Sequence, residues 1–185
     1  MWRQLDLLRT HNSSNKEKNE NMGMSEELKI NSNCKVKGNV KLYAFPADLV
    51  PDYKTYLKLE DKEKYLVSQG DNTITTIGFN VIPIILSGGT NTIDYAGVGT
   101  GSPSATALGT EVGTRVAISY HYAINNEYHL DTFYGKNDPN TSSNALTEAG
   151  LFSASSSGDM YCSKTISFTK TTSVTLLLAW YWSFA

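Results

Sequence analysis

Four carboxylate side chains in the second half of the chain are of a type that supports acid–base chemistry. A glycosidase needs two such groups about 5 to 9 Å apart across a substrate cleft, and the sequence places no two of them together in space. A nucleophilic serine is not indicated either, because no serine occupies the centre of a G-x-S-x-G turn. We therefore predict no catalytic residues and a protein that is not an enzyme. The four carboxylates are Glu111, Asp131, Glu148 and Asp159.

The histidines and cysteines do not follow the spacing of a metal site. Structural zinc ligands usually come in close pairs such as C-x-x-C, whereas Cys34 and Cys162 lie far apart in the chain. His121 and His129 flank a predicted two-residue turn, whose register places them on opposite faces of a sheet. We predict no metal ion. The two cysteines are either free thiols or a disulfide between the first and last strands, and a disulfide would need an oxidising compartment.

The glycine-rich segment Gly97-Val-Gly-Thr-Gly superficially resembles a nucleotide-binding loop. A dinucleotide fingerprint leads directly into a helix, whose N-terminus receives the phosphate, but Ser102-Pro103-Ser104 follows here and no Walker lysine is present. We interpret the segment as a tight turn or bulge between strands and predict no cofactor. The formal net charge of −2 over 185 residues favours no nucleic-acid partner.

Alternating apolar and polar residues predict antiparallel strands. Arg115–Ile124 and Glu127–Tyr134 both alternate, and only Asn125-Asn126 separates them, a pair that tolerates the positive φ of a two-residue turn. A β-hairpin is therefore predicted. Val174–Phe184 places apolar and aromatic residues on one face, as a central strand does. Lys35–Ala44 has one polar face with three lysines, which is typical of an edge strand.

Two segments allow more than one interpretation. Tyr53–Gln69 is either a second strand with a turn or a short helix, and the periodicity of Asn72–Ser87 fits a helix and a strand equally well. The polar residues 1–30 are predicted to be an extended arm, disordered or ordered by a partner subunit. Translation starts at Met1 or at Met24.

The predicted fold class is mainly β, an antiparallel β-sandwich of about eight strands with one short helix. It is expected to form a single domain over residues 31–185. We recognise neither a signal peptide nor a segment long enough to span a membrane.

Aromatic residues crowd the predicted hairpin and the last strand. Most are expected in the core, but Tyr and Trp are also enriched at contact surfaces, where one side is apolar and the other is wet. We single out Tyr120, Tyr128 and Trp182 as candidates for protein contact or for stacking on a sugar ring.

A specific order of motifs runs through the second half of the chain. Ile93–Arg115 contains the G-V-G-T-G-S-P run and Leu108-Gly-Thr-Glu-Val, and it is followed by the hairpin, by Leu146-Thr-Glu-Ala-Gly-Leu-Phe and by Met160–Phe184. This order resembles a family of tailed-phage and archaeal-virus proteins, described as tail, fibre or otherwise uncharacterised virion components. The resemblance covers about residues 72–185 and carries over no catalytic residues. In that family a short helix ending in a glycine pair precedes these motifs, which implies that Thr73–Leu86 is helical.

The resemblance implies a non-enzymatic virion structural protein, tail-associated or capsid-decorating, that acts by self-assembly and contact with other virion proteins. The alternative is a carbohydrate-binding module for host attachment, with a glycan bound on surface aromatics. We expect a homo-oligomer; trimers are common among fibre-like proteins of this kind, and no residue fixes the number. The expected location is the virion, after synthesis in the host cytoplasm.

The T-E-A-G-L-F element also predicts a local contact. Ala149-Gly150 lets another backbone approach closely. In this setting Glu148 is expected to pair with a basic residue, for which Arg115 is the candidate, or to accept hydrogen bonds from backbone N–H groups. The alternative is a solvated carboxylate at a strand end.

Overall fold

The computed structural model describes residues 35–86, 89–139 and 144–185, and all of these belong to one compact unit. The predicted arm over residues 1–30, with its Met24, lies outside the described residues, as does Cys34. The question of a disulfide to Cys162 therefore stays open.

The described residues form ten strands, two α-helices and one 3-10 helix. In chain order these are β1 (Val36–Pro46), α1 (Tyr53–Lys58), the 3-10 helix η1 (Lys62–Tyr65), β2 (Leu66–Asp71), β3 (Thr73–Ile74), α2 (Thr76–Leu86), β4 (Tyr95–Gly99), β5 (Val116–Ala117), β6 (Tyr120–Ile124), β7 (Glu127–Tyr134), β8 (Asn144–Phe152), β9 (Met160–Lys170) and β10 (Val174–Phe184).

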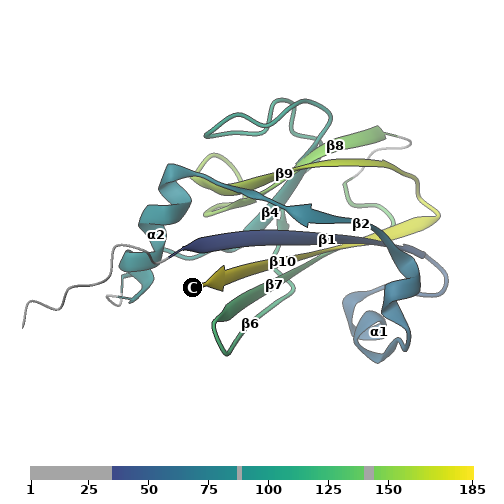
Figure 1. Cartoon of the computed structure of the whole chain (residues 1–185). Coiled ribbons are helices and arrows are strands. Elements are labelled where there is room, and N and C mark those ends of the chain that lie inside the picture. Colours follow the sequence, from purple (N-terminus) through teal and green to yellow (C-terminus); the bar gives the residue numbers. More distant parts are fainter. Residues whose placement is uncertain (1–34, 87–88, 140–143) are drawn as a thin grey trace, which may run out of the picture. The chain divides into compact units, whose positions relative to one another are not determined.

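The strands make two sheets of five strands each, and every pairing is antiparallel. Sheet A has the order β2-β1-β10-β7-β6, and sheet B has the order β3-β9-β8-β4-β5. Figure 1 shows β1, β10 and β7 running together in one layer and β8 and β9 in the other. The predicted antiparallel β-sandwich is confirmed. It has ten strands where about eight were expected, because β3 and β5 are two-residue strands, and a second α-helix, α1, is present.

A continuous apolar core fills the space between the two sheets. The inner face of β10 supplies side chains to it, and Trp180 and Trp182 are among the most buried residues. Because β10 is hydrogen-bonded to β1 on one side and β7 on the other, the prediction of a central core strand is confirmed. Sheet B contributes mostly small and branched residues opposite these rings: Ala96, Val98, Leu146, Ala149, Leu151, Cys162 and Ile166.

The β6–β7 hairpin has the predicted register. Ile124 pairs with Glu127 and Tyr122 with His129, and Asn125 adopts the positive φ of 54° that the turn requires. The preceding strand is shorter than predicted, because the chain leaves sheet B after β5 and enters sheet A only at Tyr120.

The prediction that the first strand lies at a sheet edge is wrong. β1 is paired with β2 on one side and β10 on the other. Its lysine-bearing face is exposed near Lys37, but Lys41 is half-buried and bonded to Glu63 at 3.0 Å. Alternation reports which faces are wet, and it carries no information about which edges are paired.

The two ambiguous segments are both mixed. Tyr53–Gln69 contains α1, η1 and the first part of β2, so both of its alternatives occur in turn. The implied helix over Thr73–Leu86 is present from Thr76 onward, after the short strand β3. Thr75 begins it, because its hydroxyl accepts a 2.9 Å hydrogen bond from the backbone N–H of Gly78.

The chain crosses between the sheets at both long edges of the sandwich. Asn72 alone connects β2, an edge strand of sheet A, to β3, an edge strand of sheet B. On the opposite side, Ile118 and Ser119 connect β5 to β6, the other two edge strands. No helix in the described part of the chain is long and apolar enough to cross a membrane.

Truncation of Trp180 tests where the core lies. Trp180→Ala is expected to lower the free energy of unfolding by about 3–5 kcal/mol, because it leaves a cavity between the sheets. The exposed Tyr120 provides the matched control, and Tyr120→Ala is expected to cost about 1 kcal/mol or less. Urea unfolding followed by far-UV circular dichroism measures both, and equal losses would contradict this placement of the core.

Candidate contact surface

The outer face of sheet A is covered at one end and open at the other. At the covered end, α1 and η1 lie over a second apolar cluster, formed by Tyr43, Phe45, Val50, Tyr56, Phe133, Leu177 and Ala179. The turn end of the β6–β7 hairpin lies at the other end, away from α1 (Figure 1), whereas Phe133 near the end of β7 belongs to the covered cluster. All five residues of β6 are exposed there. Tyr120, Tyr122 and Ile124 keep 54%, 40% and 51% of their surface accessible.

Four rings form a row across this open end, which we call the aromatic strip: Tyr120, Tyr122, His129 and Tyr181. The ring centroids of Tyr120 and Tyr122 are 5.6 Å apart, those of Tyr122 and His129 4.6 Å, and those of His129 and Tyr181 4.5 Å. The strand register explains the row, since Tyr122 pairs with His129 and His129 with Tyr181 on the same face. Such a row offers flat, amphipathic surface to a protein or a sugar ring.

Two carboxylates lie beside the aromatic strip. Glu127 contacts the His129 ring nitrogen at 2.9 Å, and the Tyr53 hydroxyl donates a 2.7 Å hydrogen bond to Asp131. Burial raises the pKa of Asp131, although the Tyr53 hydrogen bond and the positive charges nearby oppose that rise. Burial also raises the pKa of Tyr181 to about 12.

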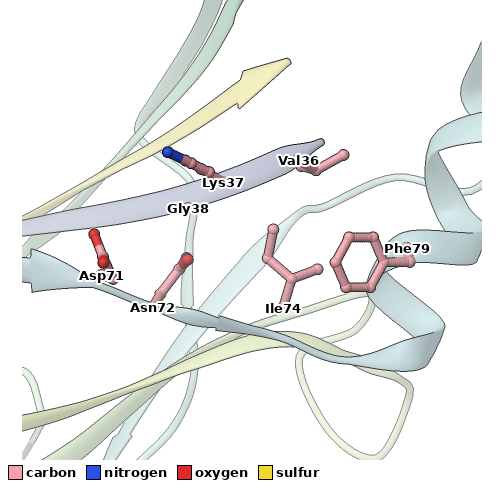
Figure 2. Close-up of a pocket in the computed structure, with 7 residues that line it drawn as sticks. All are labelled: Val36, Lys37, Gly38, Asp71, Asn72, Ile74 and Phe79. Atoms are coloured by element: carbon pink, nitrogen blue, oxygen red, sulfur yellow. The ribbon is translucent and has the colours of Figure 1, made fainter. Parts of the chain in front are cut away.

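A separate pocket of about 360 Å³ opens where β1, the β2–β3 connection and α2 meet. Figure 2 shows Ile74 and Phe79 near one another at one end and Asp71 and Asn72 at the other, whereas the Lys37 ammonium lies on the opposite side of β1. Asn72 sits directly over Gly38, where an added Cβ would lie 1.5 Å from the Asn72 Oδ1 atom. The pocket thus brings apolar surface and one carboxylate together, without a convergent set of reactive groups.

Glu148 holds the loop that follows β4. Its side chain is fully buried and accepts hydrogen bonds from the backbone N–H groups of Gly101, Gly109 and Thr110 at 3.1, 2.9 and 2.8 Å. Thr147 adds a 2.5 Å hydrogen bond from its hydroxyl to the carbonyl of Gly101. The second of the two predicted roles, an acceptor of backbone N–H bonds, is the one that Glu148 fills.

The proposed pair between Glu148 and Arg115 is not formed. Arg115 makes a two-point contact with Glu111, at 2.7 and 3.0 Å, and donates to the carbonyls of Ala154, at 2.9 Å, and Ser157. Its guanidinium also lies 3.5 Å from the ring centroid of Phe152. Glu111 lies only four residues before Arg115 in the chain and forms the ion pair that the sequence analysis assigned to Glu148.

The glycines of the G-V-G-T-G segment serve the same loop. A Cβ added to Gly99 would lie 2.4 Å from both the Glu148 carboxylate and the Thr110 carbonyl, and one added to Gly101 would lie 2.8 Å from the Thr110 nitrogen. Close backbone approach therefore explains these glycines. We call the resulting arrangement of Glu148, Arg115 and residues 99–115 the loop clamp.

The aromatic residues singled out from the sequence have three different environments. Tyr120 is exposed and belongs to the aromatic strip, as a contact residue requires. Tyr128 is half-buried and packs against the core on the inner face of β7. Trp182 is only 1% exposed, so its proposed contact role is wrong: it points between the sheets, as alternate residues of β10 do.

Sequence reasoning missed Tyr122, His129 and Tyr181 as members of one surface. The signal was present for the first two, because the hairpin register already pairs them. Tyr181 required knowledge that β10 lies beside β7, which no local pattern contains. Among the described residues no group of three His, Cys, Asp or Glu side chains is arranged to hold a metal ion.

The thiol of Cys162 lies in the core, close to Asn72 and Trp182. Burial raises its pKa, and the neighbouring groups only partly oppose this. The thiol is therefore protonated and inert at neutral pH.

No protein-family model matches this chain, and comparisons with curated proteins and with solved structures find no similar protein.

Removal of the Glu148 carboxylate is expected to release the loop clamp. Glu148→Ala removes a fully buried carboxylate and leaves three partly buried backbone N–H groups without their acceptor, so we expect a loss of about 1–3 kcal/mol in the free energy of unfolding. Hydrogen exchange measured by NMR should show lost protection at Gly101, Gly109 and Thr110. The control Asp159→Ala removes a more exposed carboxylate and should leave these amides protected; unchanged exchange in Glu148→Ala would contradict the clamp.

The buried Asp131 carboxyl predicts a dependence of stability on pH. Because its folded pKa is raised, the folded protein holds this proton more tightly than the unfolded chain does. The protonated Asp131 carboxyl stabilises the folded protein at low pH. This stabilisation is lost as the pH rises from the ordinary pKa of an aspartate carboxyl through the raised pKa of Asp131 in the folded protein. Asp131→Asn removes this dependence. The unfolding free energy of the variant minus that of the wild type should therefore increase as the pH is raised from about 3 to about 7. A constant difference in urea titrations at the two pH values would refute the assignment.

Proposed function

We propose that this protein is a non-enzymatic structural protein of a virus particle, tail-associated or capsid-decorating, that contacts further copies of itself and other virion proteins. The observation that carries the contact role is the exposed strand β6, which presents Tyr120, Tyr122 and Ile124 side by side without a charged residue. Contiguous apolar and aromatic surface of this kind marks protein interaction sites. Its placement in the virion is supported by the resemblance of the motifs to virion proteins.

The loop clamp supports a structural role for those motifs. Glu148 is occupied by three backbone N–H groups, Glu111 by Arg115, and Asp131 by Tyr53. Each of these side chains makes at least one contact that holds the fold together. The G-V-G-T-G and T-E-A-G-L-F segments thus act as two halves of one packing unit on sheet B.

A carbohydrate-binding role for host attachment is the second candidate, and the aromatic strip is the observation in its favour. Tyr120 and Tyr122 expose their rings with a 36° angle between the planes, next to the polar groups of His129 and Asp131. Ring faces beside hydrogen-bonding groups suit a sugar, which has both apolar C–H faces and hydroxyl groups. In this alternative the glycan would lie along the same strip.

Particle composition and glycan binding separate the two candidates. For the structural role, we expect the protein to co-purify in many copies with particles of the virus that encodes it, as measured by quantitative mass spectrometry. The double variant Tyr120→Ala/Tyr122→Ala should enter particles at least tenfold less than wild type, because it loses the largest exposed contact area.

The control Val67→Ala alters an exposed apolar residue of β2, outside the aromatic strip, and should enter particles normally. Absence of the wild-type protein from purified particles contradicts the structural role. A saturable glycan-array signal that Tyr122→Ala abolishes would favour the carbohydrate-binding alternative instead.

A further inference from the structure

The four sheet edges differ in how well they are protected against pairing with another chain. Natural proteins protect edges with short strands, charges, prolines and bulges. In sheet B both edge strands, β3 and β5, have only two residues. In sheet A, β2 carries a bulge at Val67 and ends in Asp71, whose carbonyl receives a hydrogen bond from Lys164.

Strand β6 has none of these protections. It reads Tyr-His-Tyr-Ala-Ile, it contains no proline, lysine, arginine or acidic residue, and it pairs with β7 over five residue pairs without a register break. All its residues are exposed, and β6 is the last strand of sheet A among the described residues. Its outer edge is therefore the place where sheet A is open to extension.

The hairpin register shows which backbone groups face outward from that edge. Ile124 and Glu127 flank the two-residue turn, and this pair is hydrogen-bonded in such hairpins. Hydrogen-bonded and non-hydrogen-bonded pairs alternate along an antiparallel ladder. The N–H and C=O groups of His121 and Ala123 consequently point away from β7.

We propose that β6 pairs antiparallel with β6 of a second copy of this chain, about a twofold axis at Tyr122, so that the two copies of sheet A become one continuous sheet. In this register His121 lies opposite Ala123 of the second copy, and the outward groups of these residues make four N–H···O=C hydrogen bonds across the axis. Tyr122 then faces Tyr122 of the second copy in a non-hydrogen-bonded pair, where side chains approach most closely. This proposal rests on the part of the proposed function that assigns contact with further copies.

The side chains of β6 fit this symmetric arrangement. Tyr120 lies opposite Ile124 of the second copy, so the three large exposed side chains of each copy pair with those of the other on one face of the joined sheet. A twofold axis requires a surface that is complementary to itself, and the strand satisfies this, because its exposed apolar residues and its outward peptide groups are both symmetric about Tyr122. The strand also carries no charge that would repel its own copy.

The size of the contact predicts a weak dimer. Three half-exposed side chains and one strand edge per copy bury on the order of 1,000 Å² in total, below the range of stable specific interfaces. We therefore expect a micromolar or weaker dissociation constant in isolation. Repetition in an assembly would strengthen it, since tethering raises the effective concentration of each contact.

Sedimentation equilibrium of the full chain over a range of concentrations tests the pairing. Ala123→Pro removes an outward N–H group that is not used in the bond to β7, and Tyr122→Lys places two like charges on the axis. Each variant is expected to weaken self-association at least tenfold while keeping the wild-type circular dichroism spectrum. The matched control Val67→Lys puts the same charge on the other long edge of sheet A and should associate as wild type does.

A disulfide cross-link tests the register. With Cys34→Ser as background, Tyr122→Cys is expected to form a covalent dimer under mild oxidation, because facing residues of a non-hydrogen-bonded pair lie about 4.5 Å apart at Cα. His121→Cys is the control, since its own counterpart lies diagonally across the axis at about 7–8 Å. Equal or faster cross-linking of His121→Cys would overturn the register.

The outcomes separate this pairing from the broader proposed function. A wild-type chain that stays monomeric at several hundred micromolar, or a Val67→Lys variant that dissociates as fully as Tyr122→Lys, overturns the β6 pairing and leaves a virion role with other partners intact. A dimer that forms as described but is missing from purified particles supports the pairing and refutes the virion role.

Discussion

The double pairing of β10 is the constraint on which the rest of the structure depends. This strand hydrogen-bonds to β1 and β7, and it is buried on both faces over most of its length. Its inner face supplies Trp180 and Trp182 to the core between the sheets, while Leu177 and Ala179 on its outer face require the cover of α1 and η1. Only toward its C-terminal end does the outer face become polar and open. The contact surface lies where this cover ends.

The loop clamp shows how motif residues can be specific without being reactive. A carboxylate that accepts three backbone N–H groups needs those groups to converge within about 3 Å of it, and only a particular loop path achieves this. The glycines at 99 and 101 permit that path because no Cβ intervenes. Holding a loop on the single buried carboxylate of Glu148 thus requires glycines and a glutamate at fixed positions. A ligand-binding loop has a similar pattern, because its backbone must also approach an acceptor group closely.

Local patterns in the sequence predicted the features that depend on neighbouring residues. The two-residue separation of β6 and β7 determines their register, and the alternation in β10 identifies its core face. The features that failed depend on neighbours distant in the chain. Nothing near Lys37 or Lys41 reveals that β2 covers that edge of β1, and nothing near Arg115 reveals the carbonyls of Ala154 and Ser157.

The aromatic strip lies between these two cases. Tyr122 and His129 are brought together by the hairpin alone, whereas Tyr181 joins them only because β10 lies next to β7. Trp182 shows the converse, since its residue type suggested a contact role, whereas the alternation along β10 places its side chain on the core face. The helix α2 was predicted from the resemblance of the following motifs to virion proteins, because the periodicity of Asn72–Ser87 alone fits a helix and a strand equally well.

The crossings at Asn72 and at Ile118–Ser119 have a mechanical consequence. Each crossing joins an edge strand of one sheet to the adjacent edge strand of the other, so a short covalent connection links the two sheets at each long edge. A force that pulls the two sheets apart is then resisted by the covalent backbone at these two connections, in addition to the side-chain packing between the sheets. The two sheets therefore cannot separate along one long edge while remaining joined at the other, since each long edge carries a covalent connection between them.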